Sequence, residues 1–255
     1  MDEAWLRRIG ADLKIAMLFA TRIALPHGAP IGGADFARAS WALPVAGLLI
    51  GLLSALAYWI ATYFRLPPFV CATLAVAVSL GVTGGLHEDG LADTFDGLGG
   101  ATREDRLTIM RDSRLGTYGA CALVLSLLLR IGALASLAAA TPAARALIAA
   151  HAGARAMMPL FLRLVPPARA DGLAADAGRP PAASVAAAVL IGLLLLLIEL
   201  STARSLAALL LLAAAFAAAR WLAVRRFGGQ TGDLAGALEQ VGEIAVLLVA
   251  ASGHV

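Results

Sequence analysis

Long apolar stretches alternate with shorter polar connections along most of the chain. A helix needs about 20 mostly apolar residues to cross the hydrocarbon core of a bilayer, which is about 30 Å thick. We expect the apolar stretches to be helices, because lipid offers no partners for unpaired backbone groups. They cover residues 41–64, 68–86, 117–140, 144–165, 183–200, 204–224 and 234–252. The pattern predicts an all-α, polytopic transmembrane bundle of about seven spanning helices, built as one membrane domain over 1–255.

The first segment, residues 4–24, has a different pattern. Its apolar residues recur at helical spacing: Leu6, Ile9, Leu13, Met17 and Ala20. This spacing predicts an amphipathic helix lying on the membrane surface. The alternative is a short helix packed against the bundle. Arg22 interrupts the apolar stretch and no small-residue cleavage site follows, so a signal peptide is not expected.

Composition supports a membrane protein and excludes other classes. Hydrophobic residues make up 60% of the chain and charged residues 15%, whereas soluble domains have about 45–50% and about 25%. The net charge of +3 gives no basis for nucleic-acid binding. Cys71 and Cys121 lie in apolar runs, so they are expected to be packing residues.

The connections predict the orientation of the bundle. Three of them are long or charged: 87–116, 166–182 and 225–233. Seven spans place these connections and the N-terminus on one side, together with most of the 20 Lys and Arg residues. The other side has only Arg65, Arg145 and Arg204. The positive-inside rule then assigns the charged side to the cytoplasm.

An acidic segment begins the first of these connections. Asp89, Asp93 and Asp96 have the spacing i, i+4, i+7, so a helix would place their carboxylates on one face. Like charges at that spacing repel, and a divalent cation would offset the repulsion. Hard oxygen ligands suit Mg²⁺, and Glu88 could be a fourth ligand. The alternative is a solvated acidic loop.

Two further polar segments are candidates for the same site. Arg111 and Arg114 alternate with Asp112 and Ser113 just before the third span, and arginine forks bind phosphate oxygens. The alternative is that these arginines only anchor the helix end at the lipid headgroups. In the last segment, Thr231 or Asp233 could cap the final helix.

The last span carries two carboxylates, Glu239 and Glu243. Carboxylates inside a membrane normally face the bundle or a polar cavity. Arg155 and His151, four residues apart in another span, are candidate partners for them. Arg130 is alone in its span; it could snorkel to the interface and is assigned no role.

Five motifs resemble one known family, the cobalamin-5′-phosphate synthases, also called adenosylcobinamide-GDP ribazoletransferases. They occur in order: FATRIALP (19–26), HEDGLADTFDG (87–97), RDSRLGTYG (111–119), ARADGLAADAG (168–178), and GGQTGD with the following GA and E (228–239). The resemblance covers most of the chain. One departure is Glu88, where many members have a neutral residue, and this puts its role as a ligand in doubt. A proline missing directly after Ile23 is a minor difference.

The resemblance implies a Mg²⁺-dependent enzyme of the bacterial inner membrane, with its active site facing the cytoplasm. Its substrates would be adenosylcobinamide-GDP and α-ribazole or α-ribazole 5′-phosphate, and GMP would be released. It implies that Asp89, Asp93 and Asp96 hold metal, and that one of these aspartates or His87 accepts the hydroxyl proton. The residues expected to bind substrate or phosphate are Arg111, Asp112, Ser113, Arg114, Arg155, Thr231, Asp233 and Glu239. A homo-oligomer is left open.

Two other functions compete with this interpretation. A CDP-alcohol phosphatidyltransferase also uses spaced aspartates beside a membrane helix, but its motif has an alanine–arginine pair where Ala92 is followed by Asp93. A transporter could use the charged residues of the spans as a polar pathway. That function is expected to come with inverted repeats or broken helices, and the sequence shows no repeat.

Overall fold

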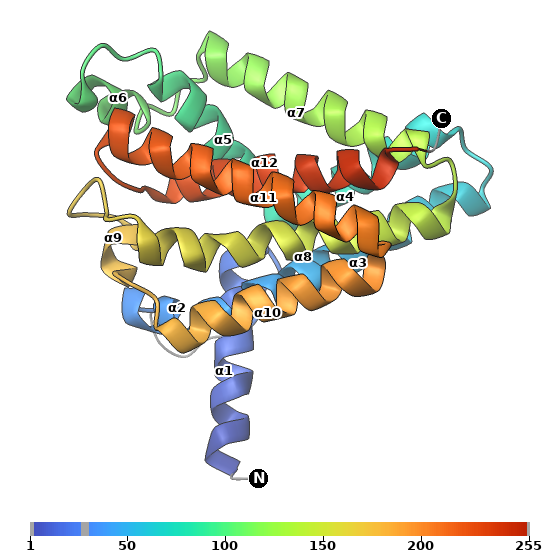
Figure 1. Ribbon diagram of the computed structural model, residues 1–255, viewed down its shortest axis with the longest axis horizontal. Helices are drawn as coiled ribbons and strands as arrows, with labels where there is room; N and C mark the ends of the chain where they lie inside the picture. Colours follow the sequence, from blue (N-terminus) through green and yellow to red (C-terminus); the bar gives the residue numbers. More distant parts are fainter. Residues whose placement is uncertain (1–2, 27–30, 254–255) are drawn as a thin grey trace.

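The protein is a bundle of α-helices in a computed structural model, which describes residues 3–26 and 31–253 (Figure 1). These residues form no β-strand; Pro167 and Gln230 make an isolated bridge. The helices are α1 (Glu3–Ala20), α2 (Gly33–Ala39), η1 (Ser40–Ala42), α3 (Leu43–Tyr63), α4 (Pro68–Thr83), α5 (Leu86–Gly97), α6 (Arg103–Ile109), α7 (Thr117–Ser136), α8 (Ala140–Leu164), α9 (Leu173–Ala177), α10 (Ala182–Glu199), α11 (Thr202–Leu222), η2 (Ala223–Phe227) and α12 (Gly232–Ala251). The all-α class is therefore confirmed.

Helix α8 is the centre of the bundle and is buried along most of its length. It packs against α3, α10 and α12. Glycines allow the closest of these approaches: a Cβ on Gly47 would lie 2.3 Å from the carbonyl oxygen of His151, and one on Gly51 would lie 2.8 Å from the Cα of Ile148. Small residues serve the same purpose in membrane helices generally, because they let backbones come close together.

The predicted spans are confirmed in part. Among the described residues, five helical segments are long and apolar enough to cross a membrane: Gly33–Tyr63, Thr117–Ser136, Ala182–Glu199, Thr202–Phe227 and Gly232–Ala251. Helices α4 and α5 form a sixth if they are counted as one broken span. Helix α8 is not among these segments, although the bundle buries it along most of its length. The total of seven spans stays a prediction.

Helix α1 runs across the direction of the bundle and projects beyond it (Figure 1). Helix α1 is held to the bundle by Asp12, which is buried and accepts hydrogen bonds from Arg38 and from the indole of Trp41. Trp5 and Leu6, near its free end, are about half exposed. This geometry is what the interfacial-helix prediction requires, because a helix lying in the membrane plane crosses the spanning helices.

The long connections gather at one end of the bundle. Helices α6 and α9 and the start of α12 lie at this end, whereas the turns α3–α4, α7–α8 and α10–α11 lie at the other (Figure 1). The sequence predicted this segregation from the seven expected spans, with the uneven distribution of arginines in support. All three motif segments that were expected to bind substrate therefore meet at the same end.

Candidate active site

The acidic segment is helical, and its start is set by two glycines. Gly84 and Gly85 have φ of 70° and 69°, a left-handed conformation that glycine adopts without steric cost. They turn the chain by 90° between α4 and α5. The connection 87–116 was predicted as a loop, but it contains α5 and α6. Thr102 and Asp105 form a reciprocal capping box that starts α6.

The start of α12 packs directly on α5. A Cβ on Gly90 would lie 2.8 Å from the backbone oxygen of Asp233, so only glycine permits this contact. Thr231 caps α12, since its hydroxyl accepts a hydrogen bond from the amide of Leu234 at 3.2 Å. Asp233 is free of the capping role, and its carboxylate accepts a hydrogen bond of 3.0 Å from Arg169. The packing brings Asp233 beside the aspartates of α5.

Asp93 lies among these acidic residues and is affected by the charges of the others. It belongs to α5, which follows the predicted span 68–86 and belongs to the polar end of the bundle. Its pKa is raised to about 7, first by burial and then by other carboxylates, with partial opposition from Arg169. Those carboxylates are Asp89, Asp233 and Asp96. Repulsion among acidic groups is the usual sign that a site holds a cation or a shared proton.

Asp96 is used differently from the other two aspartates of the predicted metal face. Its carboxylate accepts hydrogen bonds of 2.8 Å from the backbone amides of Gly116 and Gly119. These amides begin α7, where the helix dipole favours a negative charge. These bonds join α5 to α7, and the role of Asp96 as a metal ligand stays a prediction. Asp89, Asp93 and Asp233, unlike Asp96, each line a cavity beside α5.

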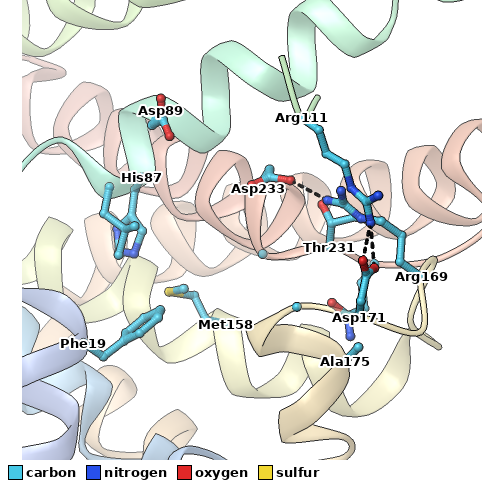
Figure 2. Close-up of a pocket in the computed structure, with 14 residues that line it drawn as sticks. Phe19, His87, Asp89, Arg111, Met158, Arg169, Asp171, Ala175, Thr231 and Asp233 are labelled. Carbon is cyan, nitrogen blue, oxygen red and sulfur yellow. Dashed lines mark hydrogen bonds and ion pairs between the residues drawn. The ribbon is translucent and has the colours of Figure 1, made fainter. Parts of the chain in front are cut away.

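Two cavities flank α5. The first, which we call the Phe19 cavity, has a volume of about 350 Å³ (Figure 2). Phe19, Leu86 and Met158 form its apolar wall, and Asp89, Asp233, Arg111, Arg169 and Asp171 are among its charged residues. The second, the Asp93 cavity, has a volume of about 700 Å³. It is lined by Asp89, Asp93, Arg22, Arg111, Asp112, Ser113 and Arg114, among others. Leu86, Asp89 and Arg111 line both cavities.

The predicted arginine segment lies in this site. Arg111 donates from Nη2 to both carboxylate oxygens of Asp171, at 2.7 Å each. Arg114 pairs with Asp112, and its side chain and backbone amide lower the pKa of that carboxyl to about 2. Both pairs are exposed, so an incoming phosphate could compete for either arginine. The position of Arg111 and Arg114 fits phosphate binding. It does not require the alternative, that these arginines only anchor the helix end at the lipid headgroups.

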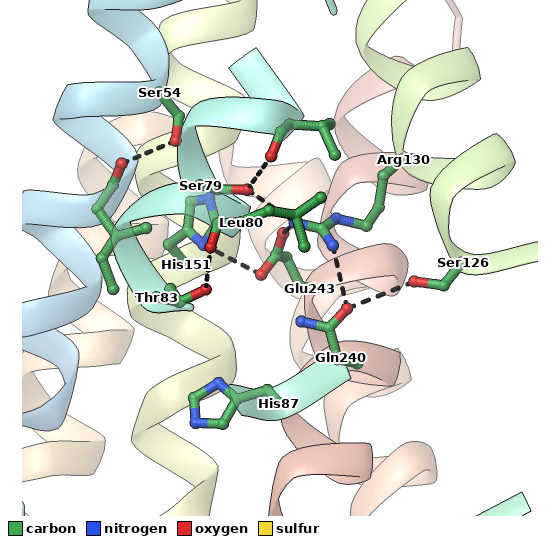
Figure 3. Close-up of polar contacts among 12 residues, drawn as sticks. Ser54, Ser79, Leu80, Thr83, His87, Ser126, Arg130, His151, Gln240 and Glu243 are labelled. Carbon is green, nitrogen blue, oxygen red and sulfur yellow. Dashed lines mark hydrogen bonds and ion pairs between the residues drawn. The ribbon is translucent and has the colours of Figure 1, made fainter. Parts of the chain in front are cut away.

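Beneath the site lies a network of buried charges (Figure 3). Glu88 points into the bundle, where Arg130 donates to its Oε1 at 2.8 Å. Arg130 also pairs with Glu243 at 2.8 Å, and Glu243 lies 3.0 Å from Nδ1 of His151. Glu88 was predicted as a metal ligand; Arg130 engages its Oε1, while the residue also borders the Asp93 cavity, so its role as a ligand stays a prediction. Arg130 is 1% exposed and does not snorkel.

The same network holds three residues that were expected to contact substrate. Arg155 lies 2.6 Å from Oε1 of Glu239, and Nδ1 of His87 lies 3.1 Å from Oε2 of Glu239. Arg155 and Glu239 are almost completely buried, and neither lines one of the two cavities. Arg155 was expected to bind phosphate and Glu239 to bind substrate. In the structure these two residues instead pair with each other. His87 is also buried but reaches the wall of the Phe19 cavity.

The pairing of the intramembrane charges was predicted correctly. His151 and Arg155 on α8 meet Glu243 and Glu239 on α12. The transporter alternative treated these groups as a polar pathway. In the structure they are instead paired with one another inside a closely packed bundle, and none of them lines either cavity of the site.

Several site residues were not singled out from the sequence. Phe19, Arg22, Met158, Arg169 and Asp171 line the cavities. Four of them lie in the motifs 19–26 and 168–178. The family resemblance of these motifs therefore pointed to the four positions, although their residue types alone did not. Met158 lies in an unremarkable apolar run, and only the packing of α8 reveals it.

The fold and the site together define a polytopic membrane protein with an acidic, arginine-lined site at one end of its helical bundle. A family model described as Cobalamin-5-phosphate synthase matches residues 12–251. The chain belongs to this family. The match includes every helix that contributes to the two cavities.

Curated relatives agree with this family over nearly their whole length. The chain is similar to an adenosylcobinamide-GDP ribazoletransferase of Bradyrhizobium diazoefficiens, with 53% identity over 97% of this chain and 95% of the relative. It is 47% identical to the enzyme of that name from Mesorhizobium japonicum, over 96% of this chain and 94% of the relative. The protein of that name from Azorhizobium caulinodans is 50% identical, over 94% and 95%. No solved structure matches the chain.

Proposed function

We propose that this protein transfers the adenosylcobinamide phosphate group of adenosylcobinamide-GDP to α-ribazole or α-ribazole 5′-phosphate. The names of its relatives support these substrates. The structural observation that carries the proposal is the pair of cavities that share Asp89 and Arg111. A transfer between two substrates needs two binding spaces that meet at the reacting atoms, and this arrangement provides them.

The reaction forms one P–O bond and breaks another. The ribazole 3′-hydroxyl oxygen bonds to the phosphorus that carries the corrinoid arm. The bond from that phosphorus to the bridging oxygen of the diphosphate breaks, and GMP leaves with that oxygen. The hydroxyl proton must leave as well, and Asp89 is the carboxylate that lines both cavities. We assign proton acceptance to Asp89.

Mg²⁺ fits the carboxylates that remain available. Asp89, Asp93 and Asp233 offer hard oxygen donors. Burial first, and then the charges of Asp89 and Asp233, raises the pKa of Asp93, and a cation would offset the repulsion between these carboxylates. These three residues would hold the ion in our proposal. Bound there, Mg²⁺ would neutralise diphosphate charge, as in other phosphoryl transfers.

The arginines bind and orient the phosphates. Arg22, Arg111 and Arg114 line the Asp93 cavity, and their guanidinium groups can fork onto phosphate oxygens. Ser113 lies between two of them and adds a hydroxyl donor. Diphosphate binding would exchange the present partners of these arginines, Asp112 and Asp171, for phosphate oxygens.

We further propose that the site faces the cytoplasm from the bacterial inner membrane. Most arginines cluster at the end of the bundle that carries the site, and the positive-inside rule assigns that end to the cytoplasm. This side is also where nucleotides are available. The apolar helices support a multi-pass protein, and labelling of single cysteines introduced at Glu104 and Arg65 in intact vesicles would test the orientation.

Turnover by purified protein in liposomes tests the proposed activity. Adenosylcobinamide-GDP and α-ribazole 5′-phosphate are supplied with Mg²⁺, and GMP release is followed beside an EDTA control. We expect Mg²⁺-dependent GMP release together with a new corrinoid product. Folded protein that releases no GMP under these conditions would overturn the proposal.

A further inference from the structure

The two cavities differ in a way that separates the two substrates. The Phe19 cavity has an apolar end formed by Phe19, Met158 and Leu86, and a charged end at Arg111 and Arg169. Figure 2 shows Phe19 and Met158 together at one end, with the arginines and Asp171 at the other. The Asp93 cavity is lined by charged and polar groups, among them Asp89, Asp93 and Asp112, and by aliphatic residues and Met110, but by no Phe, Tyr or Trp. Of the two cavities, only the first has the ring of a phenylalanine in its wall, against which a flat apolar ring can pack.

We infer that the Phe19 cavity binds the acceptor nucleoside and that Phe19 and Met158 select its base. This inference rests on the proposed function and names the subsite of one substrate. α-Ribazole consists of a benzimidazole ring on a ribose, so it has one flat apolar part and one polar part. Aromatic faces and thioethers are favourable contacts for such a ring, and the ribose then lies toward Asp89.

The size of the cavity agrees with this occupant. A volume of about 350 Å³ lies at the lower end of the range for small-molecule sites, about 300–1,000 Å³. A nucleoside is a small ligand, whereas a corrinoid nucleotide is several times larger. The donor therefore presents only its diphosphate part to α5, through the larger cavity of about 700 Å³.

The recess is rigid, which a selective site requires. The ring of Phe19 packs against Phe36 on α2, with 4.5 Å between ring centroids. Met158 is 2% exposed and belongs to α8, the central helix of the bundle. The backbone beside Phe19 is also tied to the bundle, since the amide of Arg22 donates to Val82 on α4 at 2.7 Å. A base in this recess would touch side chains from three helices: Phe19 on α1, Leu86 on α5 and Met158 on α8.

The test compares kinetic constants for the two substrates. Phe19→Leu keeps apolar bulk against Phe36 but removes the aromatic face, and Met158→Ala enlarges the recess. We expect each to raise the KM of α-ribazole 5′-phosphate by about tenfold, while the KM of adenosylcobinamide-GDP changes by less than about twofold. Met158→Ala should also improve the use of acceptors with larger bases relative to benzimidazole.

Two matched variants separate this result from a general loss of packing. Met158→Leu conserves volume, so it should raise the KM of α-ribazole 5′-phosphate less than Met158→Ala does. Leu123→Ala removes an apolar side chain that lines only the Asp93 cavity, so base preference should stay the same. The inference is overturned if the protein releases GMP normally and the Phe19 and Met158 variants leave acceptor KM and base preference unchanged. Absence of GMP release in the unchanged protein would instead refute the proposed function.

Discussion

The carboxylate of Asp96 accepts a hydrogen bond of 2.8 Å from the backbone amide of Gly116, twenty residues further along the chain. A second bond of 2.8 Å comes from Gly119. The acidic helix is thereby fixed to the first turn of α7. Because the arginine segment runs directly into that turn, the two predicted motifs form one site.

Gly119→Ala should loosen this junction. Its Cβ would lie 2.3 Å from the Asp96 carboxylate and 2.9 Å from the backbone oxygen of Ala92, so α5 and α7 must move apart. We expect destabilisation of about 1–3 kcal/mol and lower GMP release. Thermal unfolding in detergent measures the first. Gly132→Ala is the control, since nothing lies within 4 Å of a Cβ there in the same helix. Equal unfolding temperatures for the two variants would contradict the account.

The Glu88–Arg130 pair should be structural. Removing one partner of a buried ion pair costs about 3–5 kcal/mol. Arg130→Met should therefore be strongly destabilising, because it removes the ion-pair partner of Glu88 and leaves Glu243 with only His151 and Arg155. The double change Glu88→Gln with Arg130→Met should recover part of the loss. Unfolding of Arg130→Met, Glu88→Gln and the double variant in detergent gives the coupling free energy between Glu88 and Arg130. If Glu88→Gln abolishes turnover while its unfolding temperature is unchanged, Glu88 is a ligand after all.

Cation binding should weaken as the pH falls below about 7. The pKa of Asp93 is raised from an ordinary value of 3.8 to about 7, so below that pH a proton competes with the cation. Without a cation, the folded state binds this proton more tightly than the unfolded state, and stability should fall as the pH rises from about 4 to about 7. Mn²⁺ titrations near pH 6 and near pH 8 measure the effect. Equal affinity at both, or an unchanged affinity in Asp93→Asn, would count against the site.

Arg111 should affect both substrates, because it lines both cavities. Arg111→Ala removes a forked phosphate donor, and loss of such a charged contact costs about 2–5 kcal/mol. We expect kcat/KM to fall by at least about 30-fold, with higher KM values for donor and acceptor. Arg225→Ala, an exposed arginine at the same end of the bundle, is the matched control. A change in the KM of one substrate alone would place Arg111 in only one subsite.

The predictable part of the site was its local geometry. The spacing of Asp89, Asp93 and Asp96 would place their carboxylates on one face if the segment were helical, and the structure shows that it is a helix. The pairing of α8 with α12 through His151 and Glu243 was also predicted, because buried charges in a membrane need partners. The segregation of long and short connections followed from the expected order of spans, and the arginine positions supported it.

Roles that depend on distant packing could not be predicted. Asp96 was predicted as a third ligand, and only the structure shows that α7 supplies two amides for it. Glu88 and Asp89 are adjacent in sequence, but successive residues on a helix point in different directions. Glu88 pairs with Arg130 and borders only the Asp93 cavity, whereas Asp89 borders both cavities. Met158 gave no signal, since an apolar residue in a central helix looks the same whether it borders a cavity or another helix.

The most direct test of the central claim is the turnover of Asp93→Asn. GMP release from adenosylcobinamide-GDP and α-ribazole 5′-phosphate is measured in liposomes with Mg²⁺, beside the unchanged protein and Glu104→Gln, an exposed acidic control on α6. Our account predicts a loss of at least about 100-fold for Asp93→Asn, normal release for Glu104→Gln, and similar unfolding temperatures for both. Near-normal GMP release by folded Asp93→Asn would contradict the assignment of the active site.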